Sequence, residues 1–260
     1  MPFLVYDLET SHAPWMPPYK ADKPDAFEPP PYHQIEIVGL LWLDWAGEDL
    51  VARKLACLPG ESEAELVAKF VRIAADEKVT CVSFGGRNFD MPVMTAATMR
   101  AGVPFPARFR RMSKRWGSDH VDVSDALGDF GACRSAGGLE AWSLSLGWPG
   151  KLDGIHGGDV ATMIATGRRD AAEAYCMGDC CMLAGVFLRL LHARNTLSSA
   201  AYVRAVESLI SLIEKEPRLG LWSTRIDRER VLRVAPEPEP KVAAGPAEPA
   251  NDQPKPEAAA

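Results

Sequence analysis

The feature that most constrains this chain is an apolar segment near its N-terminus that carries two acids. Residues 4–10 read LVYDLET, and Asp7 and Glu9 stand one residue apart in a run that otherwise suits a buried strand. Because side chains alternate between the two faces of a strand, both acids point to one face and Leu8 points to the other. The two acids therefore lie either on the solvent-exposed face of an edge strand or in a site that needs negative charge.

The order of the segments along the chain predicts an α/β domain in which helices flank a mixed sheet. Short apolar runs predict strands at residues 3–8, 35–45, 49–58 and 79–84. The spacing of apolar residues predicts helices at 61–78, from Asp90 to about Arg100, from Arg168 or Arg169 to about Asn195, and at 199–215. Strands thus dominate the first part of the chain and helices the rest, which is typical of one sheet with helical cover.

The domain is expected to span residues 1–233, with a C-terminal helical extension at 197–233. Residues 234–260 are rich in Pro, Ala and Glu and hold too few apolar side chains to form a core, so we expect a disordered tail. This tail carries five acids and two lysines, which is half of the net charge of −6. A second irregular segment is expected at residues 11–34, which contain seven prolines.

The sequence predicts a cytoplasmic protein that has no membrane partner. The N-terminal apolar run is short, lacks a basic start and ends in acids, unlike a signal peptide. No segment is expected to supply the ~20 apolar residues of a membrane span. The cysteines show no framework spacing, so we expect them to be reduced and to pack in the core.

Acids stand in two further places where packing alone does not require them. Asp90 follows the predicted strand at 79–84 and begins a helix, and Asp179 lies within an otherwise apolar helix. Asp90 could be an ordinary first-turn acid, and Asp179 could face water on one side of its helix. Aspartate is rarely buried without a partner, however, and the neighbours of Asp179 are apolar.

If the strand of Asp7 and Glu9 is central, these acids and the carboxylates of Asp90 and Asp179 converge. Two carboxylates ~5.5 Å apart repel each other by roughly 3 kcal/mol at an effective dielectric constant of 20. Four could not all stay ionised unless a cation neutralised them or some bound protons. Oxygen ligands suit Mg²⁺ or Mn²⁺, and two such ions ~3.5–4 Å apart are the usual arrangement for in-line attack on a phosphodiester.

Tyr175 adds a further candidate group to this site. It lies four residues before Asp179, so the two side chains share a face of the predicted helix. A phenol in this position could orient the attacking water or help to deprotonate it. The alternative is a core tyrosine whose hydroxyl group is hydrogen-bonded.

These segments resemble a known family. YDLET, NFDMP and YCMGD are similar to the three motifs of DnaQ-like 3′-5′ exonucleases of the tyrosine-bearing (DEDDy) subclass. Similar members include the proofreading domains of B-family polymerases and the predicted polymerase-B-like 3′-5′ exonucleases. The resemblance covers residues 3–190. The histidine subclass would have His where this chain has Ala174.

The resemblance implies an RNase H-like fold and two divalent metal ions, Mg²⁺ or Mn²⁺. It implies that Asp7, Glu9, Asp90 and Asp179 are the metal ligands and that Tyr175 positions the water. Gly85 stands where B-family domains usually have the first Asn of the second motif, whereas Asn88 matches the second Asn.

The expected substrate-binding residues are Thr10, Asn88, Phe89, Arg111 and Arg115. The two arginines belong to the basic run RFRRMSKRW at 108–116, which offers cations for phosphates and Trp116 for stacking on a base. The alternative is a solvated loop. Downstream of this run, Asp125 is expected to cap a helix and His120 to be structural.

The sequence therefore predicts a stand-alone, metal-dependent 3′-5′ exonuclease that acts on single-stranded DNA or RNA 3′ ends, without a polymerase domain in cis. The alternative is a non-catalytic RNase H-like module that binds nucleic acid or a protein partner. Such a module would have lost a carboxylate, and the sequence keeps all of them. Three neighbouring cysteines, Cys176, Cys180 and Cys181, could suggest a zinc protein, but they have no second ligand pair. The sequence identifies no protein partner and does not distinguish DNA from RNA.

Overall fold

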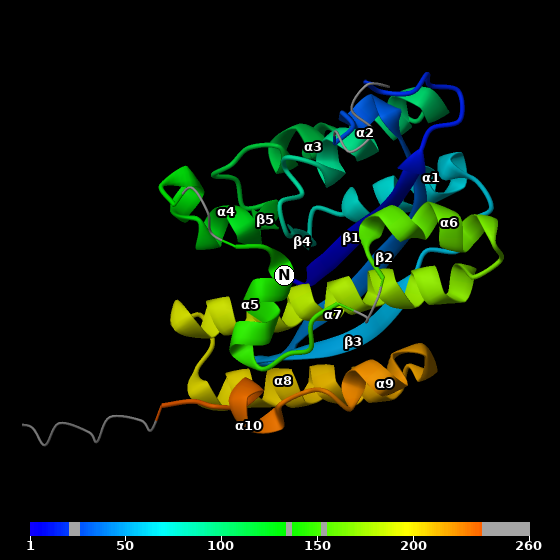
Figure 1. Cartoon of the computed structure of the whole chain (residues 1–260). Helices are drawn as coiled ribbons and strands as arrows, with labels where there is room; N and C mark the ends of the chain where they lie inside the picture. The colour runs from blue at the N-terminus through cyan, green and yellow to red at the C-terminus, as the bar shows by residue number, and fades with distance from the viewer. Residues whose placement is uncertain (21–26, 134–136, 152–154, 236–260) are drawn as a thin grey trace, which may run out of the picture.

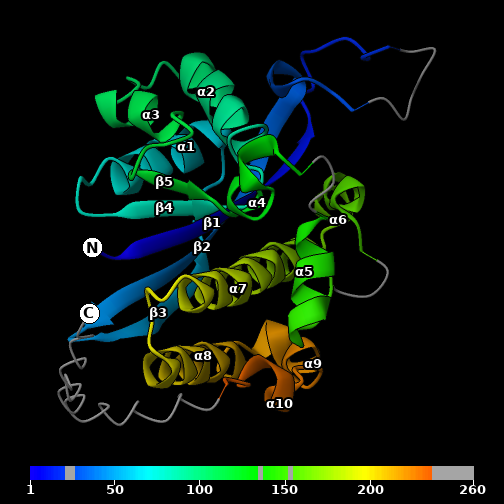
Figure 2. The same cartoon turned by 90° about the vertical axis from the view of Figure 1, so that its left-hand side faces the viewer.

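The computed structural model describes residues 1–20, 27–133, 137–151 and 155–235. A five-stranded sheet in the order β3-β2-β1-β4-β5 forms its centre, and helices cover both faces (Figures 1 and 2). The strands are β1 (Phe3–His12), β2 (His33–Ala46), β3 (Asp49–Cys57), β4 (Thr80–Ser83) and β5 (His120–Asp122). The predicted tail lies outside the described residues from residue 236 on, as do residues 21–26 of the predicted irregular segment.

The central strand of the sheet is β1. It pairs antiparallel with β2 and parallel with β4, while β2 and β3 are antiparallel and β4 and β5 are parallel. The predicted mixed sheet flanked by helices is thus confirmed, as is the central position of the strand that carries both acids. β1 extends beyond its predicted end because Ser11 and His12 pair with Gln34 and His33 of β2.

Ten α-helices and four short 3-10 helices occur in the described part of the chain. The α-helices are α1 (Glu63–Ala74), α2 (Asp90–Ala101), α3 (Ala107–Met112), α4 (Val123–Leu127), α5 (Leu139–Leu146), α6 (Val160–Ala165), α7 (Arg169–Ala193), α8 (Ser199–Glu214), α9 (Gly220–Ser223) and α10 (Arg228–Val231). The 3-10 helices are η1 (Pro30–Tyr32), η2 (Asp129–Gly131), η3 (Gly157–Asp159) and η4 (Pro217–Leu219). The predicted helical extension at 197–233 contains α8, η4, α9 and α10.

The two largest hydrophobic cores in the described part of the chain lie on the two faces of the sheet. Leu4, Tyr6 and Leu8 of β1 pack in the core that also holds buried side chains of α1, α2 and α3. Val5 packs in the other core, with side chains of α7 and α8. Figure 2 shows α1, α2 and α3 on one side of the sheet and α7 and α8 on the other. Since side chains alternate along β1, its odd-numbered acids face α7.

The long helix α7 is the centre of the second core. By length and composition it could cross a membrane, with a mean hydropathy of 1.5 in its most apolar window, and this corrects the expectation that no segment would qualify. Of that window, 83% is buried inside the fold. The apolar composition of α7 therefore matches its position between the sheet, α5 and α8.

Candidate active site

The four acids found in the sequence line one cavity of about 700 Å³. Asp7 and Glu9 come from β1, Asp90 is the first residue of α2, and Asp179 lies in the middle of α7. The cavity is lined by residues of the C-terminal half of β1, of η3 and α6, and of the loop that leads into α2. Segments that are far apart in the sequence thus bring four carboxylates to one place.

These carboxylates are so close together, and so shielded from water, that the charge of one makes the others harder to ionise. Glu9, Asp90 and Asp179 are buried, whereas Asp7 is half-buried and opens into the cavity. Burial raises the pKa of Asp7 well above its ordinary value, and the charges of Asp179, Glu9 and Asp90 raise it further. Burial and the charge of Asp179 likewise raise the pKa of Glu9. A cation in the cavity would remove this conflict.

The other two acids are perturbed in the same direction. Burial, followed by the charge of Asp122, raises the pKa of Asp90 to about 7. Burial raises the pKa of Asp179 to about 6, although the ammonium group of Lys151 acts in the opposite direction. Neutral protonated acids therefore coexist with carboxylates near neutral pH when no metal ion is bound.

The position of α7 depends on a glycine. Gly39 of β2 pairs with Asp7 across the sheet, and α7 crosses directly above it. A Cβ atom on Gly39 would lie 2.7 Å from the sulfur of Cys176 and 2.9 Å from the sulfur of Cys180. Because no side chain stands there, α7 can approach closely enough to bring Asp179 to the acids of β1.

Cys176 is a neighbour of the acids rather than an additional ligand. Its thiol donates weak hydrogen bonds to the Asp7 backbone oxygen at 3.7 Å and to Oδ2 of Asp7 at 3.8 Å. One ligand atom each of Asp7, Glu9 and Cys176 lies within 4.8 Å of the others. Hydrogen bonds with Cys180 and Cys57, and then burial, raise the pKa of Cys176 well above its ordinary value. Because hard cations such as Mg²⁺ and Mn²⁺ prefer oxygen to sulfur, the carboxylates are the expected ligand set.

The loop before α2 is shaped so that it presents Asp90. Gly85 has a φ angle of +72°, which glycine adopts freely and asparagine more readily than most residues. The backbone conformation at Gly85 is therefore one that an Asn in this position could also adopt. The difference from the family pattern is the missing Asn side chain. A Cβ atom on Gly86 would lie 2.8 Å from Oδ2 of Asp90, so this position leaves room for the carboxylate.

Asp122 holds this loop from the neighbouring strand. Its Oδ1 accepts a hydrogen bond from the Gly85 amide at 2.8 Å, and its Oδ2 accepts one from the Arg87 amide at 2.9 Å. Asp122 is also the N-cap of α4, so the prediction that Asp125 caps this helix was wrong. Asp125 lies in the first turn and forms ion pairs with Arg87 and Arg115 instead.

His120 has the structural role predicted for it. It is buried and hydrogen-bonded to the Ser83 hydroxyl at 2.7 Å and to the Met112 backbone oxygen at 3.2 Å. Burial lowers the pKa of His120 to about 4, so the ring is neutral at physiological pH.

Lys151 is a member of the site that the sequence did not reveal. Its Nζ donates a hydrogen bond to the hydroxyl oxygen of Tyr175 at 2.5 Å and forms an ion pair with Oδ2 of Asp179 at 3.3 Å. Burial and the charge of Asp179 raise the pKa of Tyr175, against the influence of Lys151. The phenol therefore keeps its proton and can donate it in a hydrogen bond, which favours orientation of a water molecule over its deprotonation. The only sequence signal is one lysine after Gly150 in a glycine- and proline-containing stretch.

The second oxygen of Asp179 provides a test of whether a metal ion fits. Oδ1 of Asp179 is buried and has no hydrogen-bond partner among the residues that the structure describes. A buried carboxylate oxygen without a partner costs about 1–3 kcal/mol or more. Together with an all-oxygen set of ligands, this unpaired atom fits a hard divalent cation such as Mg²⁺ or Mn²⁺.

Two of the expected substrate-binding residues line the cavity, namely Thr10 and Phe89. Oγ1 of Thr10 donates a hydrogen bond to Nδ1 of His33 at 2.9 Å, and Nε2 of His33 donates one to the Glu28 backbone oxygen at 3.0 Å, with the tautomer assigned from these partners. Asn88 is exposed in the loop and does not line the cavity.

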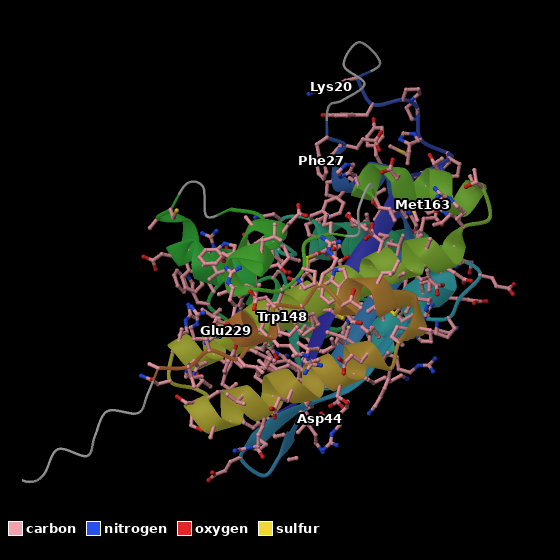
Figure 3. All side chains as sticks on the ribbon, turned by 60° about the horizontal axis from the view of Figure 1, so that its bottom comes forward. Lys20, Phe27, Asp44, Trp148, Met163 and Glu229 are labelled. Carbon is pink, nitrogen blue, oxygen red and sulfur yellow. The ribbon has the colours of Figure 1, made fainter. Side chains whose placement is uncertain are left out.

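Aromatic rings form a rim on the cavity. The ring of Phe27 is 75% exposed and lies 5.3 Å from the ring of Phe89, which in turn lies 4.8 Å from the ring of His33. Phe27 lies at the end of the molecule opposite Asp44 (Figure 3). The sequence did not indicate Phe27 or His33, since both belong to the proline-rich segment; a single Phe among polar residues and prolines was the only signal.

The expected substrate-binding arginines do not line this cavity. Nε of Arg111 donates to Oδ2 of Asp119 at 3.0 Å, and its Nη2 pairs with Glu77. Arg115 pairs with Oδ1 of Asp125 at 2.9 Å. Arg108 of the same basic run is buried and also pairs with Asp119. A role for Arg111 and Arg115 in substrate binding stays a prediction.

Comparison with known proteins finds one family model that matches the chain. A family model described as "Predicted 3'-5' exonuclease related to the exonuclease domain of PolB" matches residues 25–225. No curated protein matches the chain.

Solved structures of E. coli exonuclease I are similar to the chain at low identity. The complex with a dT13 oligonucleotide has 19% identity over 82% of this chain and 46% of that one, with a TM-score of 0.38. The zinc-ion-bound complex of this exonuclease with ssDNA has 15% identity over 75% of this chain and 41% of that one, with a TM-score of 0.40. The chain spans less than half the length of these proteins.

Proposed function

The chain belongs to the family of predicted 3′-5′ exonucleases related to the exonuclease domain of PolB, and we propose that it hydrolyses phosphodiester bonds at the 3′ end of single-stranded DNA or RNA, using two divalent metal ions. One observation carries the proposal: Asp7, Glu9, Asp90 and Asp179 line a single cavity, and a buried oxygen of Asp179 lacks a partner in the described part of the chain. A non-catalytic module would have no need to keep four mutually repelling carboxylates, because their repulsion destabilises the fold.

The carboxylates would hold Mg²⁺ or Mn²⁺. When bound, the two ions would activate the attacking water and stabilise the negative charge on the departing 3′ oxygen. Oxygen ligands from β1, α2 and α7 fix the site on rigid elements, so little reorganisation is needed during the reaction.

Tyr175 and Lys151 act as positioning residues in this scheme. The ammonium group of Lys151 donates to the phenol oxygen, so the phenol proton is left free to be donated elsewhere. A water molecule that accepts this proton in a hydrogen bond is held in one orientation beside Asp179. Lys151 also partly neutralises Asp179 before a metal ion binds.

The aromatic rim supports a preference for single strands. A base that stacks on Phe27 must expose its face, which bases inside a duplex do not. The rings of Phe89 and His33 pack against the Phe27 ring, so the Phe27 ring is already positioned when a strand binds. The cytoplasmic location also belongs to the proposal.

The function can be tested with 5′-labelled single-stranded DNA and RNA of the same sequence. We expect a ladder of products that shortens from the 3′ end in Mn²⁺ or Mg²⁺ and that disappears in EDTA. The Asp7→Asn variant serves as the control and should be inactive. No shortening of either oligomer by the folded wild-type protein in Mn²⁺ would contradict the proposal.

A further inference from the structure

A second surface with the features of a nucleic-acid contact lies on the other side of the loop that carries Asp90. Phe89 and Asp90 of this loop line the active-site cavity, whereas Arg87 lines a separate cavity of about 200 Å³. Trp116 and Phe130 also line this second cavity. The Trp116 side chain is 76% exposed, so its ring is accessible to a ligand.

The two aromatic rings are held in place by the backbone around them. Trp116 lies 4.2 Å from Phe130, with 37° between the ring planes. Phe130 and its neighbour Asp129 have φ angles of +52° and +47°, a left-handed conformation that side chains other than glycine rarely adopt. Nη1 of Arg115 donates to the Phe130 backbone oxygen at 3.0 Å and so connects the two loops. The pair of rings is therefore presented in a fixed orientation.

The surroundings of the rings are cationic. Arg87, Arg115 and Arg194 line the cavity. Among the described residues, Asp122 is the only acid that lines it, and Asp125 is the only acid that forms ion pairs with these arginines. Arg194 is exposed and uses one nitrogen to hold the Ala126 backbone oxygen at 3.2 Å.

Further positive charge comes from α3 and the turn after it. Arg110 and Lys114 are exposed, and neither side chain has a hydrogen bond or ion pair in the part of the chain that the structure describes. Cations beside an exposed aromatic ring are the combination with which proteins bind single strands: the cations attract phosphates and the ring stacks on a base.

We propose that Trp116 and Phe130, together with Arg115 and Arg194, bind the single strand upstream of its 3′-terminal nucleotide. The inference rests on the proposed function, which places the 3′ end at the acids. Fifteen residues of α7 and its C-cap separate Asp179 from Arg194, which corresponds to about 22 Å along the helix axis. At about 3.4 Å per stacked nucleotide, a strand that reaches from the acids to the Arg194 end of this surface covers about six nucleotides.

The test measures binding without cleavage. Anisotropy of fluorescently labelled oligothymidylate is followed in EDTA, with oligomers of about 12 and about three nucleotides. Stacking of one base contributes about 1–3 kcal/mol, so Trp116→Ala should weaken binding of the longer oligomer about 5-fold to 150-fold. The short oligomer cannot span both sites, so its affinity should not change. Trp116→Phe should restore most of the affinity.

Leu221→Ala provides a matched control, because Leu221 is an 85% exposed apolar residue of α9, outside this surface. Equal affinity of the wild type and Trp116→Ala for the longer oligomer would overturn the proposal and leave this surface for a protein partner. An equal loss of affinity for both oligomers would also overturn it, since the effect would then not be confined to the upstream strand. If Trp116-dependent binding is found but no nucleotide is released in Mn²⁺, the proposed function fails while the binding surface stands.

Discussion

Lys151 and Tyr175 share a hydrogen bond of 2.5 Å between Nζ and the phenol oxygen, which sets the direction in which the phenol proton can be donated. Since Lys151 comes from the segment after α5 and Tyr175 from α7, this contact connects two otherwise separate parts of the site. The acids that bind the metal ions are thus accompanied by a positioning pair.

The first prediction concerns this pair. Lys151→Met should lower kcat about 100-fold, because positioned proton donors and acceptors contribute about 10²–10⁴-fold to catalysis. KM should change little, because Lys151 is expected to orient the attacking water and not the strand. Steady-state degradation of a labelled oligomer at a series of concentrations measures both constants. Lys151→Arg should recover part of the activity, whereas an effect of Lys151→Met confined to KM would show that Lys151 binds the strand instead.

The second prediction concerns the aromatic rim. Phe27→Ala should raise KM about 5-fold to 150-fold, because it removes a stacking surface for a base. Phe27→Tyr preserves the ring and should behave like the wild type. An oligomer that lacks the base at its 3′-terminal nucleotide should be degraded equally by the wild type and Phe27→Ala. If Phe27→Ala is impaired to the same degree on both oligomers, the ring does not stack on that base.

The third prediction concerns the close contact between β2 and α7. Gly39→Ala should destabilise the fold by about 1–3 kcal/mol, because the new methyl group would meet the sulfurs of Cys176 and Cys180. The substitution should also lower activity, because it would displace α7 and so move Asp179 away from the acids of β1. Chemical denaturation and the oligomer assay measure the two effects. Gly220→Ala is the matched control, because a Cβ atom there meets nothing within 4 Å.

The fourth prediction concerns pH. A carboxyl group whose pKa is higher in the folded chain stabilises the fold while it is protonated, and this contribution is lost as pH rises through the folded value. The ordinary value of 3.8 rises to about 7 for Asp90 and to about 6 for Asp179. In EDTA, these groups should therefore lower the melting temperature as pH rises from about 4 to 7. Mn²⁺ binds the ionised acids, so its stabilising effect should grow over the same interval.

Thermal melts in EDTA and in Mn²⁺ at a series of pH values test this prediction. Asp90→Asn should flatten the pH dependence in EDTA, because the amide does not ionise. A stabilisation by Mn²⁺ that is the same at pH 5 and pH 8 would show that the ion binds elsewhere.

The sequence was sufficient to predict the central elements of the fold and the acids of the site. The alternation in LVYDLET placed Asp7 and Glu9 on one face of a strand, and the apolar surroundings of Asp179 indicated a buried carboxylate. Such signals are local, because they depend on the period of a strand or a helix. The same local reasoning underestimated β1, whose end is determined by pairing with His33 and Gln34 across an intervening loop.

Other members of the site could not be predicted because nothing in their local sequence distinguishes them. Lys151 and Phe27 lie in irregular segments, where no periodicity shows which way a side chain points. The basic run showed its cations but not their partners, so the buried ion pair of Arg108 with Asp119 was missed. The N-cap of α4 was assigned to Asp125 rather than Asp122 because both acids stand close to the start of the helix.

Titration of Mn²⁺ into the metal-free protein tests the central claim most directly, because the claim is that four carboxylates form one site for two hard cations. Isothermal calorimetry at pH 8 should give two Mn²⁺ ions per wild-type chain and fewer for Asp7→Asn and Asp179→Asn. Cys176→Ser should still bind two, since its thiol is not a ligand. If the folded wild type binds no Mn²⁺, or if Asp7→Asn and Asp179→Asn bind as many ions as the wild type, the account is contradicted.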